Sequence, residues 1–317
     1  MQRLYEWLGI PFGFVIAIFY GFTGNYLLSL FCLTLVIRLC LLPAAVKQQK
    51  GVALQARLQP KLRRIRKKYE GNQRKIQEET QALYQREGTT GMTAGCLPMV
   101  IQLPIMLGLF QVNYHPFSMV LRLPDAVVTA LEAAVKPLLE GAAAKADYRM
   151  ELYALEHFNE IDHSSIAGLT ADMVERIHAF VEGYTLFGLD LSHTPSISSP
   201  DRYWAIPIIS GLLALGMSLY SFLRQKKNNP EMASNASMGC MMFFTPVMQV
   251  WFAFILPCNV GVYTIFSSIL SFVQMVALNH IYSPKKVIAR EMVKETVYRR
   301  SREANVKKIQ EMQSQND

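Results

Sequence analysis

Arg38 has the clearest chemical potential in this chain, because it stands near the middle of an otherwise uncharged apolar run, residues 25–46. A charge at the centre of a bilayer is costly, and such residues usually face a bundle interior or a water-filled cavity. From this position, snorkelling to the interface is a poor alternative. Pairing with an intramembrane carboxylate is excluded, since no Asp or Glu occurs in any of the chain's five long apolar runs. We interpret Arg38 as the charge of a hydrated cavity that attracts anionic or polar segments, with simple packing as the alternative.

The partners available to Arg38 are neutral polar side chains in the same and other apolar runs. The predicted cavity residues are Thr34, Gln102, Gln111, Tyr263, Ser267 and Gln274, and further candidates are Asn113, Gln249 and Ser268.

The sequence contains no constellation of catalytic or metal-binding residues. The apolar runs hold no nucleophile–base pair, the five cysteines form no CxxC motif, and the histidines among the acids of residues 157–178 lack a recognised metal spacing. We therefore expect no catalytic residue, no metal site and no cofactor, and we do not expect an enzyme. The missing intramembrane carboxylates also disfavour a proton-coupled transporter.

The elements that must position Arg38 are membrane-spanning helices. Of the 317 residues, 51% are hydrophobic and only 18% are charged, whereas soluble domains carry about 25% charged residues. A transmembrane helix needs about 20 apolar residues. Runs of suitable length predict an all-α membrane protein with five transmembrane helices, over residues 25–46, 93–115, 204–223, 238–256 and 258–282.

The charges between these runs predict their orientation. Residues 47–92 carry 12 Lys and Arg against 4 acids, residues 224–236 carry 3 against 1, and the tail 283–317 carries 9 against 5. Residues 116–203 instead carry 6 basic against 13 acidic residues. Because basic short loops stay in the cytoplasm, we place 47–92, the 224–237 loop and the 283–317 tail inside. The acidic 116–203 insertion and the N-terminus are then outside.

Three flanking segments have their own predicted structure. Residues 1–24 are predicted to form an amphipathic helix at the membrane interface, with a signal peptide as the alternative. Residues 47–92 are predicted to form a cytoplasmic helical hairpin that turns at Gly71-Asn72. Its basic cluster is predicted to contact anionic lipid, with ribosomal RNA or a nascent chain as the alternative; the cluster comprises Arg63, Arg64, Arg66, Lys67 and Lys68. The acidic insertion is expected to contain a small helical subdomain.

An ordered set of motifs resembles the YidC/Oxa/Alb family of membrane insertases, in its five-span bacterial form. The most distinctive stretch is Gly95-Cys96-Leu97-Pro98 with Gln102-Leu103-Pro104. The others are Leu35-Val36-Ile37-Arg38 before Leu42-Pro43, Lys47-Gln48-Gln49, Leu58-Gln59-Pro60-Lys61-Leu62, Phe187-Gly188-Leu189-Asp190-Leu191 and the stretch from Pro257 to Gln274. The 117–186 insertion departs from the family by its length.

This resemblance implies five spans around a hydrophilic groove that is open to the cytoplasm and to lipid and closed outside. Arg38 matches the family's groove arginine. The hydrophilic part of a substrate would enter the groove transiently, and its apolar segment would slide into lipid along the third and fifth spans. Nascent membrane proteins are the implied partners. The basic segments predict contact with anionic lipids, the ribosome and the Sec translocon are further candidates, and no DNA partner is expected.

Two other classes of function stay open at this point. A small-solute transporter or channel usually contains internal repeats, and none is visible between the two halves of the sequence. A scaffold that recruits ribosomes through its basic tail is the second alternative. The expected location is the bacterial cell membrane.

Overall fold

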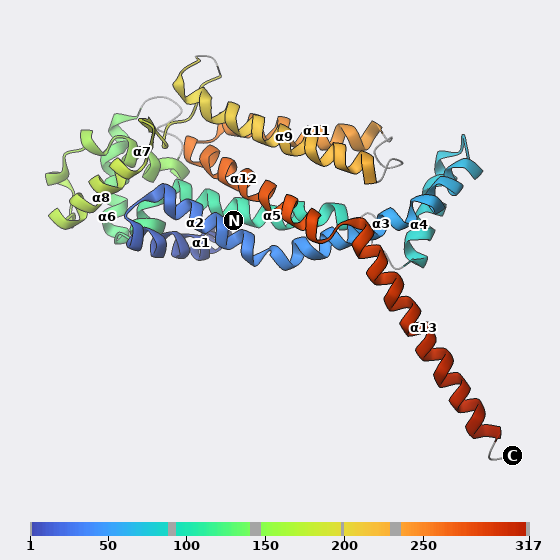
Figure 1. Ribbon diagram of the computed structural model, residues 1–317. Helices are drawn as coiled ribbons and strands as arrows, with labels where there is room; N and C mark the ends of the chain where they lie inside the picture. Colours follow the sequence, from blue (N-terminus) through green and yellow to red (C-terminus); the bar gives the residue numbers. More distant parts are fainter. Residues whose placement is uncertain (1, 88–92, 140–146, 198–199, 229–235, 315–317) are drawn as a thin grey trace. The chain divides into compact units, whose positions relative to one another are not determined.

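The computed structural model describes residues 2–87, 93–139, 147–197, 200–228 and 236–314, and most of this chain is helical (Figure 1). Parts of the predicted 47–92 hairpin, the acidic insertion, the 224–237 loop and the tail lie outside these residues. The described chain divides into two compact units. The first comprises Met1–Cys40, Leu97–Phe222 and Gly239–Phe272, and the second comprises Leu41–Cys96, Leu223–Met238 and Val273–Asp317.

Long apolar helices build most of the first unit. They are α1 Gln2–Thr23, α2 Tyr26–Cys40, α5 Thr93–Tyr114, α9 Ala205–Asn228, α11 Ala236–Ile255 and α12 Cys258–Ile281, some of which extend into the second unit. Glycines allow two close approaches among them. A Cβ on Gly211 of α9 would lie 2.3 Å from Val250 of α11, and one on Gly261 of α12 would lie 2.4 Å from Ile206 of α9. The backbones of α9, α11 and α12 therefore pack tightly at these points.

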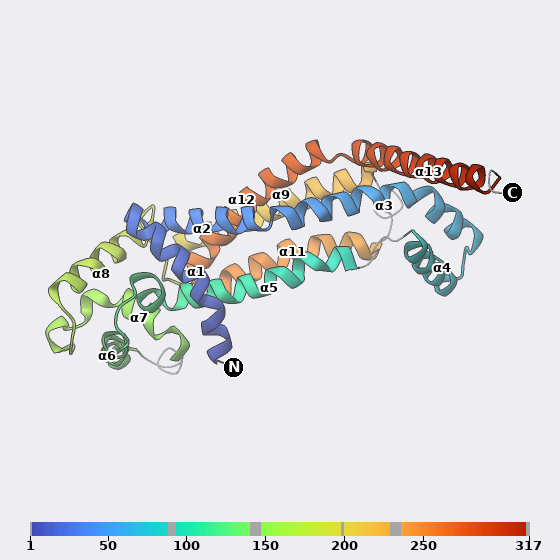
Figure 2. The same cartoon turned by 90° about the horizontal axis from the view of Figure 1, so that it is seen from below.

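Helix α1 crosses α5 and packs against α2 (Figure 2). Helix α1 continues through Pro11 and Gly13. Gly9 and Gly13 face neighbours so closely that a Cβ would meet Gln111 of α5 at 2.7 Å and Met119 at 3.1 Å. The opposite face of α1 exposes large apolar side chains at helical spacing, namely Trp7, Ile10, Phe14, Ile18 and Phe22. An exposed apolar face of this kind suits contact with lipid.

The acidic insertion folds as short helices with an apolar centre. Its helices are α6 Asp125–Val135, α7 Met150–Glu156 and α8 Ala171–Gly183, with shorter turns that include the π-helical η1 Phe117–Leu121 and the 3-10 helical η7 Arg202–Trp204. Leu131, Leu152, Phe158, Ile177 and Phe180 are fully buried between them. After α8, a small antiparallel hairpin pairs β1 Thr185–Leu186 with β2 Leu189–Asp190.

The second unit contains the helical hairpin and the C-terminal helix. Helix α3 Leu42–Lys68 begins at a break after α2, where Pro43 occupies the first turn, as proline favours. Gly71 adopts a φ of +85°, and the Asn72 side chain caps α4 Gln73–Arg86 by accepting a bond from the Lys75 N–H. Helix α13 Pro284–Ser314 packs against α3.

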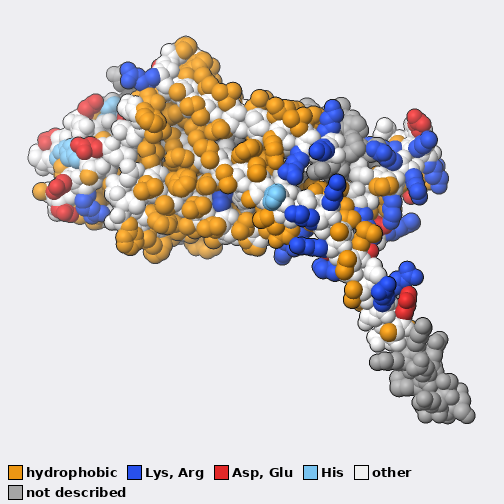
Figure 3. Space-filling model, in the orientation of Figure 1, with side chains coloured by type: hydrophobic (Ala, Val, Ile, Leu, Met, Phe, Trp, Pro, Cys, Tyr) orange, Lys and Arg blue, Asp and Glu red, His pale blue; other side chains and the backbone are white. Residues whose placement is uncertain are grey.

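The composition of the helices makes this a multi-pass membrane protein. Within the described chain, Arg202–Lys227 and Cys258–Ile281 are each long and apolar enough to cross a bilayer, and Tyr26–Cys40 meets the same criterion together with Leu42–Leu54. The space-filling view shows hydrophobic side chains covering the visible face of the apolar helices (Figure 3). Asp and Glu gather over the insertion helices α6–α8. The predicted all-α membrane class is thus confirmed.

Candidate functional site

Arg38 lies where the packing along α2 changes. The buried residues of α2 are Tyr26, Ser29, Leu30, Leu33 and Thr34, and all of them precede Arg38. From Leu35 to Cys40 every residue is half-buried or exposed. The first half of α2 is therefore packed into the protein, whereas Arg38 sits in its more open second half.

The helices that accompany α2 show a similar change. In α12, Cys258 to Tyr263 are buried, and Thr264 to Ser267 are half-buried. In α9, the buried positions all fall in the first half of the helix, and they are Ile206, Pro207, Ser210, Gly211 and Ala214. The first unit is thus well packed at the ends where α2, α9 and α12 begin and looser further along these helices.

The guanidinium of Arg38 is held by neutral groups of α12. Its Nη2 donates hydrogen bonds to the Ser267 hydroxyl at 2.5 Å and to the Ser267 carbonyl oxygen at 3.3 Å. Tyr263, one turn earlier and 7% exposed, lies close enough for an electrostatic interaction with Arg38. Among the residues that the structure describes, Arg38 forms no ion pair with a carboxylate. Arg38, Tyr263 and Ser267 are called the Arg38 site below.

Within the described chain, no hydrogen bond joins Arg38 to the other predicted cavity residues. Thr34 is buried and donates its hydroxyl hydrogen bond to the Leu30 carbonyl of its own helix at 2.7 Å. Gln111 lies beside Gly9 of α1, and Gln102 is exposed on α5. Gln274 is half-buried and belongs to the second unit.

A second polar group joins α9, α11 and α12. The Gln249 side-chain amide donates to the Ser210 hydroxyl at 3.0 Å and to the Ser268 hydroxyl at 3.3 Å, and the Ser210 hydroxyl is 2.9 Å from that of Thr264. Sequence reasoning included Gln249 and Ser268 among candidate polar partners, but it missed Ser210 and Thr264. The sequence signal that could have found both residues is that each carries a hydroxyl within an apolar helix.

Four buried polar side chains form what we call the outer cluster. The Tyr26 hydroxyl donates to Asn113 Oδ1 at 2.8 Å, and Asn259 Nδ2 donates to the same oxygen at 3.1 Å and also to the Tyr184 hydroxyl. Each side chain is at most 1% exposed. Burial raises the pKa of Tyr184 well above its ordinary value, so this phenol stays protonated. The cluster ties α2, α5 and α12 to the end of the acidic insertion.

A buried carboxylate also links α5 to the insertion. Glu151 accepts the Ser118 N–H at 3.0 Å and the Ser118 hydroxyl, and its Oε1 lies 3.0 Å from His115 Nδ1. The Ser118 hydroxyl is therefore directed at the carboxylate and not at a histidine base. Glu151 thereby ties α7 to the turn that follows α5. Within the described residues, no three or more His, Cys, Asp and Glu side chains are grouped to hold a metal.

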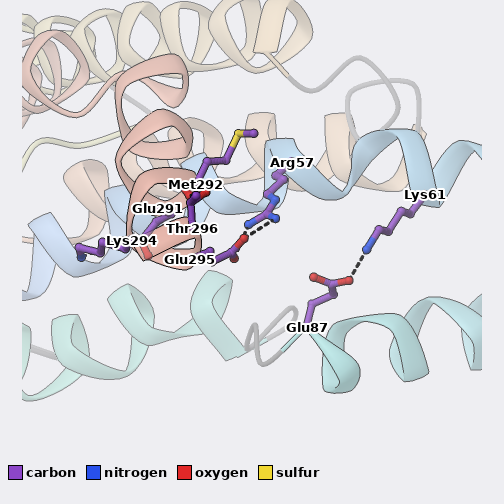
Figure 4. A network of polar contacts seen from close by, with 8 residues as sticks. All are labelled: Arg57, Lys61, Glu87, Glu291, Met292, Lys294, Glu295 and Thr296. Atoms are coloured by element: carbon purple, nitrogen blue, oxygen red, sulfur yellow. Dashed lines mark hydrogen bonds and ion pairs between the residues drawn. The ribbon is translucent and has the colours of Figure 1, made fainter. Parts of the chain in front are cut away.

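The hairpin's basic cluster presents its charges to solvent. Arg63, Arg64, Lys67 and Lys68 are exposed, and Arg66 is half-buried. At the base of the hairpin, Arg57 of α3 forms a bidentate ion pair with Glu295 of α13, at 2.7 and 2.9 Å (Figure 4). The hydrogen bond from Arg57 lowers the pKa of Glu295.

Comparisons with known proteins agree with this class of multi-pass helical membrane protein. The family model described as 60Kd inner membrane protein matches residues 18–286. The chain therefore belongs to this family, the YidC/Oxa/Alb family that the sequence motifs resemble, and that prediction is confirmed.

Several curated proteins are similar to this chain over most or part of its length. "Membrane protein insertase YidC 2" of Listeria innocua is 23% identical over 286 residues, which cover 89% of this chain and 74% of the relative. "Membrane protein insertase YidC" of Fusobacterium nucleatum is 24% identical over 274 residues, 86% of this chain and 96% of the relative. "Membrane protein insertase MisCA" of Bacillus subtilis is 39% identical over 90 residues, 27% of this chain and 34% of the relative.

Proposed function

We propose that this protein is a membrane protein insertase in which the Arg38 site receives the hydrophilic part of a substrate. Family membership and the names of the relatives support the insertase function. The proposed mechanism rests on the burial and the hydrogen bonds of Arg38. This half-buried guanidinium is bonded to the neutral groups of Ser267 and has no carboxylate partner in the described chain.

The chemistry of a guanidinium explains why such a site would be hydrated and would bind a polar segment of the substrate. Arg carries five N–H donors and no acceptor, and here both hydrogen bonds come from Nη2. A charge at membrane depth needs water or polar partners for its remaining donors. A substrate carboxylate or backbone carbonyl can replace that water, so a polar segment gains a charge-assisted hydrogen bond on entering.

The proposed membrane arrangement has five spans, over residues 25–46, 93–115, 204–223, 238–256 and 258–282. The basic segments would lie in the cytoplasm and the acidic insertion outside, with the N-terminus outside and the C-terminus inside. In this arrangement the packed ends of α2, α9 and α12 face outward, and the looser halves of these helices form a groove open to the cytoplasm. The apolar layer of Leu30 and Leu33, together with the outer cluster, would close the groove outside.

Release of the substrate would follow because its hydrophilic part and its apolar segment are stable in different surroundings. The hydrophilic part binds in the groove, and the apolar segment moves into lipid along α9 and α12, where Leu212 and Ile269 are exposed. Transfer of apolar surface out of water drives this step. The membrane potential acts on charged parts of the substrate. The groove speeds insertion because it shortens the water-free distance that the polar segment must cross.

The cytoplasmic parts offer sites for the proposed partners. The exposed basic cluster of the hairpin would contact anionic lipid headgroups or a nascent chain, and the basic tail would contact the ribosome. Nascent membrane proteins are the proposed substrates. Cooperation with the Sec translocon is a further proposal.

The test replaces Arg38 with Ala, Lys or Glu and measures insertion of a single-span substrate with an acidic translocated end, using protease protection in proteoliposomes. A charge-assisted hydrogen bond contributes about 1.5–3 kcal/mol, so Arg38→Ala should weaken capture of the acidic end roughly 10- to 100-fold. Arg38→Lys should retain part of the activity, and Arg38→Glu should lose most.

Two matched controls show whether the loss of insertion is specific to Arg38 and to the acidic end of the substrate. Arg290→Ala removes an exposed charge from the tail and should leave insertion unchanged. A substrate of equal length with a neutral end should depend much less on Arg38. A ribosome-recruiting scaffold or a solute transporter would not distinguish the two substrates, and its Arg38→Ala variant would behave as the unaltered protein does. That outcome would refute the proposal.

A further inference from the structure

Phe187 occupies the tip of the β1–β2 hairpin in a backbone conformation that does not suit its side chain. The pairing of Leu186 with Leu189 leaves a two-residue turn, Phe187-Gly188, with φ values of 52° and 75°. A turn with two positive φ angles favours Asn-Gly or Gly-Gly. Gly188 fits this requirement, whereas a bulky aromatic residue in the left-handed region is strained.

Within the described part of the chain, almost no packing offsets this strain. The Phe187 side chain is 97% exposed, the highest exposure among the large hydrophobic residues of the described chain. An aromatic ring that packs on nothing gains no burial energy. An unusual conformation at such a residue points to a role outside the fold.

The base of the hairpin is attached to the turn between two apolar helices. Leu191 donates its N–H to the Tyr184 carbonyl at 3.1 Å and accepts the Asn259 N–H at 2.9 Å, and Cys258 donates to the His193 carbonyl at 2.9 Å. Helix α11 ends at Ile255, and α12 begins at Cys258. Phe187 is four residues from Leu191, a reach of at most about 13 Å. The tip of the hairpin is therefore held near the turn that joins α11 to α12.

A second exposed aromatic residue is found at the neighbouring helix junction. Phe22, at the end of α1, is 86% exposed. A Cβ on Gly183, at the end of α8, would lie 3.8 Å from the Gly24 carbonyl oxygen, so the segment that leads into the hairpin touches the α1–α2 junction. The hairpin and the end of α1 thus present aromatic rings from adjoining segments of the same unit.

We propose that Phe187 inserts into the interfacial layer of the bilayer at this end of the spans and anchors the hairpin to phospholipid. Aromatic residues are enriched at membrane–water interfaces, and the headgroup layer on each side is several Å thick, within reach of the tip. This anchor would hold the acidic insertion against the membrane. The inference needs only a membrane-spanning chain and does not rest on the insertase mechanism.

The experiment places a single trifluoromethyl-phenylalanine at position 187 and records its ¹⁹F relaxation in phosphatidylcholine–phosphatidylglycerol nanodiscs. Relaxation by a nitroxide-bearing lipid is compared with relaxation by a water-soluble gadolinium chelate. The same probe at Phe272 of the apolar helix α12 is the lipid control, and the probe at Tyr298 of the charged helix α13 is the water control. Phe187 should respond to the lipid nitroxide as Phe272 does. A response like that of Tyr298 would overturn the proposal and favour a protein partner in the aqueous phase.

A substitution separates anchoring from packing. Phe187→Asn places a residue that the turn favours and should raise the melting temperature in detergent by about 2 °C, because the strain is relieved and no packing is lost. A melting temperature lowered by several degrees would show that the ring packs within the protein, and the proposal would fail.

Discussion

Replacing Ser267 with Ala tests whether the Arg38 site is wet. The substitution removes the hydroxyl that accepts a hydrogen bond from Arg38 Nη2 but leaves the backbone carbonyl at 3.3 Å. In a dry core, losing a bond to a charged group costs about 1.5–3 kcal/mol. In a hydrated groove, water takes the place of the hydroxyl, and we expect a loss below about 1 kcal/mol.

Ser210 provides the matched control from the same bundle. Its side chain is fully buried and accepts the Gln249 amide at 3.0 Å. Ser210→Ala removes the nearer of two hydroxyl acceptors of the half-buried Gln249 amide, which costs about 1–1.5 kcal/mol. Thermal unfolding in detergent should therefore show a drop of several degrees for Ser210→Ala and a drop of about 2 °C or less for Ser267→Ala. A larger drop for Ser267→Ala than for Ser210→Ala would rule out the wet site.

Three further predictions concern other contacts. Asn259→Ala removes donors from the buried outer cluster and should cost about 1–3 kcal/mol in unfolding free energy, measured by thermal melting; an unchanged midpoint would contradict this. Gly108→Ala should displace α1, since its Cβ would lie 2.4 Å from the Phe12 ring, and faster proteolysis of α1 would reveal it. The Arg57–Glu295 pair should add a small contribution to the packing of α13 on α3 above the ordinary glutamate pKa of 4.5, and a partial release should follow as the pH falls through the lowered pKa of Glu295. A spin-label distance should report this release, and Glu295→Gln should remove the pH dependence.

Structural features could be predicted from the sequence where the evidence for them lies within one continuous segment. Arg38 stood out because one charge interrupts an apolar run, and Ser267 was among its predicted neutral partners. Gly71-Asn72 predicted a turn, and the structure places the break between α3 and α4 there. The family motifs were readable for the same reason, since each is a short local pattern.

Contacts between distant segments could not be predicted in this way. The outer cluster brings together Tyr26, Asn113, Tyr184 and Asn259, whose pairing depends on how the helices pack. Helix α1 is another example. Its contact with α5 depends on Gly9, whose missing side chain leaves room for Gln111.

Disulfide trapping of a substrate at position 267 tests the central claim most directly. Ser267→Cys is introduced into a background without the chain's five cysteines, and an arrested substrate carries one cysteine in either its hydrophilic end or its apolar segment. Ile269→Cys, on the same helix and 44% exposed, is the lipid-facing control. We predict that position 267 captures the hydrophilic end and that position 269 captures the apolar segment. Capture of the apolar segment alone at position 267, or of neither part, would contradict a polar route past Arg38.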